Sequence, residues 1–370
     1  MASSRLHELS ELGQSVWIDN LSRELLTSGG LARLLEEDAV TGVTSNPTIF
    51  QKAIAQGDLY DDQLREVLEH EDDPREIFIA LASRDIGDAC DVLRSVWDGG
   101  RGLRGWVSIE VDPGLAYDTA GTVAQAKRLH ALLEQPNLYV KIPATKEGLP
   151  AIEEMIAVGR PINVTLIFSL ERHREVMEAY IRGLERLVEA GGDPAGVASV
   201  ASFFVSRVDT EADKRLDAIG GHDDLTGKLA VANAKLAYRH WQEAFSGDRW
   251  AALASAGARP QRCLWASTST KNPDYRDVLY VEELVGPDVV NTMPLETVLA
   301  FHDHGEVRDT LAQDVDEARR LLDELAAAGV DYDDVIETLE REGVQKFAAS
   351  FAELLDGIAG KVRVVAAGSA

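Results

Sequence analysis

The chain has 370 residues, 45 % of them hydrophobic, and 37 Lys or Arg against 63 Asp or Glu give it a formal net charge of −26. Such an acidic protein should repel nucleic acid and anionic membrane surfaces, so a phosphate substrate would need local basic residues to overcome that field. The length suits two or three domains, or a single α/β barrel with additional helices.

Cysteine usage and the first residues bear on the compartment. The two cysteines, Cys90 and Cys263, lie far apart and form no Cys-x-x-Cys pair, which argues against a zinc site or a disulfide framework. The N-terminus lacks an apolar signal region, and no run of about 18 apolar residues suggests a membrane span. We therefore expect a cytoplasmic protein with no membrane partner.

Short β-rich runs alternate with helical stretches along the chain. A helix near Arg5–Leu12, within residues 1–14, is expected before the first run. The eight runs are Ser15–Asp19, Gly42–Asn46, Trp106–Val111, Leu138–Ile142, Ile162–Phe168, Val197–Val205, Cys263–Ser267 and Asp288–Thr292. They are near-continuous apolar segments, which is typical of parallel strands covered on both faces.

The segments between these runs have helical character. Residues 47–105 should hold two or three helices, residues 228–256 a long helix or a helix pair, and residues 306–361 C-terminal helices that pack on the rest. Eight strands with intervening helices favour one (β/α)8 barrel, a TIM barrel, over residues 1–370. An open doubly wound sheet is the alternative, because the number of strands does not prove closure.

Polar side chains gather at the carboxyl ends of these strands, which form the functional face of a parallel barrel. A cap or a turn explains each of them taken singly. That explanation weakens when ionisable residues lie inside apolar runs on separate strands, as Asp19, Glu110 and Lys141 do.

Lys141 is the most informative of these residues. It lies in the apolar segment Leu138–Thr145, where an unpaired ammonium group would be costly. Burial without a close carboxylate partner lowers the pKa of a lysine amine from about 10.4, and a neutral amine is a nucleophile toward carbonyl carbon. The sequence therefore predicts Schiff-base chemistry, in which carboxylates move the protons.

Four segments resemble the transaldolase family. Gly42–Phe50 is similar to its first signature, and Tyr139–Leu149 to its second, which carries the Schiff-base lysine. Ser15–Leu21 and Asn163–Ser169 match as well, and the resemblance runs in order from about residue 10 to residue 350. The length and the segment Trp265–Thr268 resemble the longer bacterial branch. The resemblance implies a TIM barrel of the class I aldolase type, sugar phosphate substrates, and neither a metal nor an organic cofactor.

The same resemblance implies individual roles. Lys141 would form the Schiff base, and Glu110 would act through a bound water on the attacking and leaving steps. Asp19 would handle the donor hydroxyl at the cleaved bond, and Thr165 would hold the catalytic water. Residues implied to line the pocket or bind donor hydroxyls are Thr44, Asn46, Asn163, Ser202 and Phe204.

The phosphate site departs from the better-known branch of the family. Arg207 matches a phosphate-binding arginine after the sixth strand, but a second arginine after the seventh strand is replaced by Ser267–Lys271. We expect Lys271 to take its place, helped by Ser267 or Ser269, although a lysine binds phosphate as a point charge. The alternatives are that Arg207 pairs with an acidic surface residue such as Asp209 and that Lys271 is a surface residue.

The function implied is that of a transaldolase of the pentose phosphate pathway, acting on sedoheptulose 7-phosphate and glyceraldehyde 3-phosphate. A fructose 6-phosphate aldolase-type lyase is the alternative. Aldolases of that type have a glutamine where this chain has Glu110 and a tyrosine where it has Phe204, so both positions favour transfer. A non-catalytic barrel is disfavoured, because Lys141 and both carboxylates are present. Either a monomer or a homodimer is compatible with the sequence.

Two further motifs receive structural interpretations. Gly100–Gly105 has the G-x-G-x-x-G pattern, but a strand follows it instead of preceding it, so we expect a loop and not a nucleotide site. His302 and His304 have no third metal ligand nearby and should form a solvated pair at a helix end.

Overall fold

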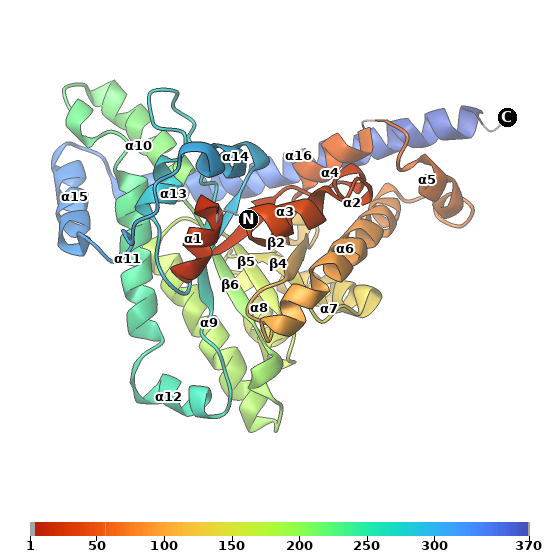
Figure 1. The fold of residues 1–370 in the computed structure, drawn as a ribbon, viewed down its shortest axis with the longest axis horizontal. Helices are drawn as coiled ribbons and strands as arrows, with labels where there is room; N and C mark the ends of the chain where they lie inside the picture. Colours follow the sequence, from red (N-terminus) through yellow and green to blue (C-terminus); the bar gives the residue numbers. More distant parts are fainter. Residues whose placement is uncertain (1–3, 56, 369–370) are drawn as a thin grey trace.

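The computed structural model describes residues 4–55 and 57–368, and Figure 1 shows how their helices surround a central sheet. The strands are β1 (Ser15–Asp19), β2 (Val40–Thr44), β3 (Trp106–Glu110), β4 (Leu138–Pro143), β5 (Ile162–Ile167), β6 (Ser199–Phe204), β7 (Arg262–Ala266) and β8 (Val290–Met293). They form a closed parallel barrel in chain order, in which β1 pairs with both β2 and β8. The predicted (β/α)8 barrel is confirmed, and the open sheet is wrong.

Sixteen α-helices are described: α1 (Arg5–Glu11), α2 (Arg23–Thr27), α3 (Gly30–Asp38), α4 (Pro47–Ala55), α5 (Asp61–Val67), α6 (Pro74–Gly99), α7 (Thr119–Leu133), α8 (Gly148–Ala157), α9 (Leu170–Glu189), α10 (Ser206–Ile219), α11 (Leu229–Ala244), α12 (Gly247–Ser255), α13 (Leu279–Glu283), α14 (Leu295–His304), α15 (Val315–Ala327) and α16 (Tyr332–Gly368). The described part of residues 47–105 thus holds the three helices α4, α5 and α6, and residues 228–256 hold the pair α11 and α12.

The second strand begins and ends two residues earlier than the sequence predicts. Pro47 is the first residue of α4, and the side-chain oxygen of Asn46 accepts the backbone N–H of Ile49 at 3.1 Å. A proline favours the first helical turn and an asparagine favours the capping position before it. Ser45 and Asn46 therefore leave the sheet to start the helix, and β2 ends at Thr44.

The tail also becomes helical later than predicted, because residues 306–314 lie outside any helix. The backbone N–H groups of Thr310 and Leu311 both donate to the carbonyl of Val285, and that of Glu306 donates to the Glu282 carboxylate. These N–H groups donate to the segment before β8 and not to carbonyl groups four residues earlier, as they would in a helix, so α15 starts only at Val315.

The core lies on both sides of the barrel wall. Every residue of β4, β5 and β6 is buried, as expected for strands with side chains inside the barrel and helices outside it. Trp17 is fully buried against Gly42, where a Cβ atom would lie 2.4 Å from the indole ring. Burial of one such side chain stabilises the fold by about 2–3 kcal/mol, so Gly42 is needed for packing and not for a turn.

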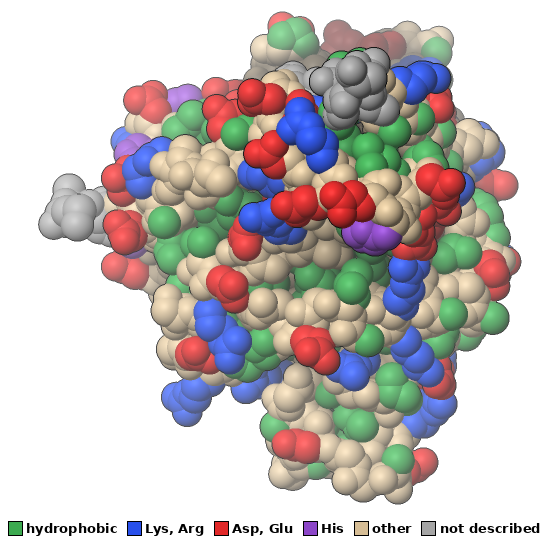
Figure 2. Space-filling view, turned by 90° about the vertical axis from the view of Figure 1, so that its right-hand side faces the viewer, with side chains coloured by type: hydrophobic (Ala, Val, Ile, Leu, Met, Phe, Trp, Pro, Cys, Tyr) green, Lys and Arg blue, Asp and Glu red, His purple; other side chains and the backbone are tan. Residues whose placement is uncertain are grey.

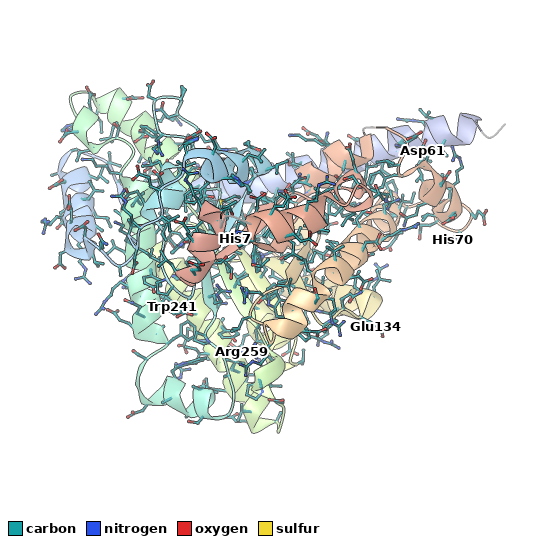
Figure 3. All side chains as sticks on the ribbon, viewed as in Figure 1. His7, Asp61, His70, Glu134, Trp241 and Arg259 are labelled. Carbon is teal, nitrogen blue, oxygen red and sulfur yellow. The ribbon has the colours of Figure 1, made fainter. Side chains whose placement is uncertain are left out.

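Helix α16 crosses the barrel end at which the strands finish. It has 37 residues, so it is about 55 Å long, and it lies beside α4 before reaching α5 (Figure 1). At its far end the Lys361 ammonium lies 2.8 Å from the carboxylate of Asp61, labelled in Figure 3, and donates to the carbonyl of Gly57 at 2.7 Å. This ion pair fixes the helix to the α4–α5 segment.

The remaining motifs have structural roles. Gly100–Gly105 forms the loop into β3, where the Gly105 N–H donates to the carbonyl of Thr41. His302 pairs with Asp38 and His304 with Asp277. Within the described ranges, no group of three or more His, Cys, Asp or Glu side chains could hold a metal ion.

None of the helices described here is long and apolar enough to cross a bilayer. On the face in Figure 2, acidic and basic side chains are mixed.

Candidate active site

A cavity of about 410 Å³ opens at the carboxyl ends of the strands, under α16. The predicted site residues that line it are Asp19, Thr44, Asn46, Lys141, Thr165, Ser202, Phe204, Arg207, Ser267 and Lys271. Two predicted residues do not line it. Glu110 lies behind the lysine, and Asn163 is fully buried below the cavity floor.

Lys141 reaches the cavity from β4, and only 7 % of its side chain is exposed. Its ammonium donates to the carbonyl of Ser45 at 3.2 Å and lies 3.5 Å from the Glu110 carboxylate. A carboxylate therefore lies close to this amine. Glu110 and Lys141 are partners in the β3–β4 register, so their side chains emerge side by side on the same face of the barrel.

The environment of Glu110 makes its carboxyl group suitable for proton transfer near neutral pH. Burial raises the pKa of Glu110 to about 7, and the nearby Lys141 charge opposes part of that rise. A group that titrates near the working pH can both release and accept a proton. Glu110 is therefore able to exchange a proton with the lysine amine.

Asp19 approaches the lysine from β1. Burial raises the pKa of its carboxyl group above the ordinary value, while Lys141 and a hydrogen bond from Thr44 act against that rise. The Thr44 hydroxyl donates to Asp19 at 2.7 Å and lies 2.7 Å from the hydroxyl of Thr292. This short chain of hydroxyls orients the Asp19 carboxyl group at the cavity wall.

Thr165 lies where β5 departs from regular geometry. The pairing of β5 with β6 shifts register between Val164 and Ile167, and Leu166 has a φ of +62°. The Thr165 hydroxyl lines the cavity and is buried, with no hydrogen-bond partner within the described parts of the chain. A buried hydroxyl of this kind is available to bind a substrate or water oxygen.

Asn163 and Ser202 form part of a polar layer below the cavity. The Ser202 hydroxyl donates to the Asn163 side-chain oxygen at 2.7 Å, and the Asn163 amide nitrogen donates to the hydroxyl of Ser108 at 3.1 Å. Asn163 therefore holds Ser202, which does line the cavity. Direct contact between Asn163 and a donor hydroxyl stays a prediction.

Arg207 stands at the start of α10, above the aromatic ring of Phe204. Its guanidinium carbon lies 5.1 Å from the ring centroid, and its buried Nη1 has no hydrogen-bond partner among the residues described. Asp209 instead accepts from the Tyr280 hydroxyl at 2.8 Å and from the Ala230 N–H at 2.7 Å. The structure thus does not form the alternative Arg207–Asp209 pair, and Arg207 presents donors to the cavity.

The opposite rim is formed after β7. The Ser267 hydroxyl lies 2.9 Å from that of Ser206, and Ser267 has a φ of +57° where the chain turns out of the strand. The ammonium of Lys271 donates to the hydroxyl of Ser269 at 2.7 Å, in an exposed position. Lys271 therefore lies at the cavity rim, where an anion can approach it from solvent.

Residues on helices complete the cavity. They were not predicted, because the predicted site residues were those at the carboxyl ends of the strands. Lys52 comes from α4, and Lys346, Phe347 and Ser350 come from α16. Lys52 follows the first signature closely, so its proximity could have been suspected. The residues of α16 are distant in sequence from every strand end and carried no usable signal.

This arrangement defines a class of enzyme site. The site combines a buried lysine amine with two carboxyl groups whose pKa values are raised, at the carboxyl end of a (β/α)8 barrel. These are the groups that an enzyme of the class I aldolase type needs to form a Schiff base and to move protons.

Sequence comparisons identify the family. The family model described as transaldolase/fructose-6-phosphate aldolase matches residues 16–358. A transaldolase of Frankia alni is 53 % identical over 360 residues, which cover 96 % of this chain and 97 % of the relative. Transaldolases of Acidothermus cellulolyticus and Thermobifida fusca are 55 % and 54 % identical, covering 94 % and 96 % of this chain and 94 % and 98 % of their own. The chain belongs to the transaldolase/fructose-6-phosphate aldolase family.

Proposed function

We propose that this protein is a transaldolase of the pentose phosphate pathway. It transfers a dihydroxyacetone unit from sedoheptulose 7-phosphate to glyceraldehyde 3-phosphate, which yields erythrose 4-phosphate and fructose 6-phosphate. The observation that carries the proposal is the amine of Lys141 in a cavity with the carboxyl groups of Glu110 and Asp19 beside it. The names of the relatives support the same reaction.

The first half of the reaction takes the donor apart. Lys141, having passed its proton to Glu110, adds to the C2 carbonyl of the ketose, and loss of one water leaves an iminium ion. Asp19 takes the proton of the C4 hydroxyl, the C3–C4 bond breaks, and its electron pair moves into the iminium group. The aldose phosphate leaves, and an enamine remains on Lys141.

The second half runs in the opposite direction. The enamine carbon attacks the carbonyl carbon of the acceptor aldehyde, and Asp19 returns its proton to the new hydroxyl group. One water then adds to the iminium carbon with the help of Glu110 and Thr165, and the ketose phosphate leaves the regenerated amine.

We further propose that the protein acts in the cytoplasm, which agrees with its two buried cysteines that form no disulfide. We also propose that it is a monomer or a homodimer.

A fructose 6-phosphate aldolase-type lyase would use the same amine but release free dihydroxyacetone. Glu110 and Phe204 favour transfer over that alternative, because the resemblance places a glutamine and a tyrosine at these positions in such aldolases. Glu110 lies beside Lys141 and Phe204 lines the cavity, so both can influence whether the enamine intermediate is transferred or released.

Acceptor dependence is the direct test of the transferase reaction. We expect fructose 6-phosphate to form from the two substrates, and free dihydroxyacetone to appear much more slowly when the acceptor aldehyde is omitted. Coupled enzymatic assays of both products measure this. Rapid release without an acceptor would support the lyase and sink the transferase proposal.

Arg207 should determine affinity for the phosphate group of the substrates. We expect Arg207→Gln to raise KM for fructose 6-phosphate by about 100-fold, because a charge-assisted hydrogen bond in a partly buried site is lost. Reaction with unphosphorylated fructose should change little. Lys271→Gln should have a smaller effect, since Lys271 is exposed.

Steady-state kinetics with both sugars measures the effect of Arg207, and Arg94→Gln on the exposed face of α6 is a matched control. An equal loss of activity on the phosphorylated and unphosphorylated sugars would show that Arg207 does not bind the phosphate.

A further inference from the structure

Phe347 of α16 lies over the reactive lysine. The Lys141 nitrogen is 5.7 Å from the centroid of the Phe347 ring, and the ring lines the same cavity. The two residues are far apart in the chain, and only Phe347 comes from a helix. An apolar ring from α16 therefore lies near the amine, while Glu110 lies 3.5 Å from it on β3 and Thr165 lines the same cavity from β5.

The helix that carries Phe347 is held close to the barrel at one point. Gly343 precedes Phe347 by four residues, so both lie on the same face of α16. A Cβ atom at Gly343 would lie 3.2 Å from the ring of Phe168 and 3.4 Å from the Leu166 side chain. The glycine therefore lets the helix backbone approach the end of β5.

Leu166 links this contact to the reaction centre. It has a φ of +62°, a conformation that is unusual for a leucine, and it directly follows Thr165 in the irregular part of β5. The same deviation directs the Thr165 hydroxyl into the cavity and the Leu166 side chain toward Gly343. The contact between α16 and the end of β5 thus helps to fix the distance between the Phe347 ring and Lys141.

Coverage of the amine matters at the enamine stage. The reactive carbon is two bonds from the Lys141 nitrogen. If water reaches it, the carbon takes up a proton, an iminium ion forms, and addition of one water releases dihydroxyacetone and the free amine. Exclusion of water from a reactive intermediate suppresses this kind of side reaction.

We propose that Phe347 is a specificity-determining residue that shields the enamine from protonation and so sets the ratio of transfer to release. This inference rests on the proposed transaldolase function. In this proposal, hydration of the iminium carbon in the normal cycle depends on Glu110 and Thr165, which come from β3 and β5 and not from α16.

The test is Phe347→Ala in the full-length chain, with transfer and acceptor-free release of dihydroxyacetone measured in parallel. We expect the ratio of release to transfer to rise by about tenfold or more, because solvent gains access to the enamine carbon. Borohydride trapping of the ketose on Lys141 should persist. Leu355→Ala, a half-buried position on the same helix that does not line the cavity, should leave the ratio unchanged.

Two further variants keep the test decisive if Phe347→Ala fails to fold. Phe347→Leu, which fills part of the space, should raise the ratio less. Gly343→Ala keeps the ring and adds a Cβ atom 3.2 Å from the ring of Phe168, a contact relieved by a shift of about a few tenths of an ångström, so the ratio should rise only slightly.

A parallel fall of transfer and release, with an unchanged ratio in all three variants, would overturn the inference. Absence of acceptor-dependent transfer in the unmodified protein would instead refute the proposed function, so the two failures are distinguishable.

Discussion

Replacement of Lys141 by alanine should reduce transfer by about 10⁴-fold or more, because no covalent intermediate can form without the amine. The fold should survive the change. The β4 backbone keeps its pairing with β3 and β5, and loss of the lysine charge favours the neutral form of the Glu110 carboxyl group. The Glu110 side chain would then be buried as an uncharged acid.

Borohydride reduction with fructose 6-phosphate, followed by peptide mass analysis, measures the covalent step directly. The unmodified protein should gain one ketose adduct on the peptide that contains Lys141, and Lys141→Ala should gain none. Lys127→Ala, at an exposed site on α7, is the matched control and should behave as the unmodified protein does. Substantial activity and labelling in Lys141→Ala would point to another cavity amine, such as Lys52 or Lys271.

Glu110→Gln should lower transfer by about 10²- to 10³-fold, since an amide of the same shape cannot accept the proton of the lysine amine. In the unmodified protein, kcat/KM should rise with pH along a limb with its midpoint near the Glu110 pKa of about 7. That limb should be absent in Glu110→Gln. Measurement of kcat/KM from pH 5.5 to 9 tests both effects, and an unchanged limb would assign it to another group.

The same pKa shift has a consequence for stability. The pKa of Glu110 is raised from 4.5 to about 7 in the folded protein, so between these values the folded state binds more protons than the unfolded state. This contribution to stability is fully present below pH 4.5 and is lost as pH rises through 7. The thermal midpoint of the unmodified protein should therefore fall relative to that of Glu110→Gln over this range. A constant difference between the two would contradict the shift.

Much of the barrel and its chemistry followed from local sequence. Apolar runs separated by helical stretches predicted all eight strands, because strands covered on both faces must be apolar throughout. Burial of a lysine ammonium in such a run costs free energy, so its presence there indicates a chemical function for Lys141. Asp19, at the end of β1, was identified in the same way. The signatures around Gly42–Phe50 and Tyr139–Leu149 then indicated the family to which the chain belongs.

Tertiary structure alone decided which of these residues meet and at what depth. The β3–β4 register places Glu110 beside Lys141, and the position of Asn163 one layer below Thr165 makes it a support for Ser202. Neither relation can be read from one strand, because register depends on both partners and depth depends on barrel closure.

The cover of the site is the clearest case. Phe347 has no neighbour in sequence that marks it as part of the cavity, and Gly343 allows the backbone of α16 to lie close to the end of β5. By itself, the sequence determined the barrel, the amine and its acids, since these depend on residue type within an element. Only close packing between distant elements decided what covers the amine, because such contacts exist only once the barrel has closed.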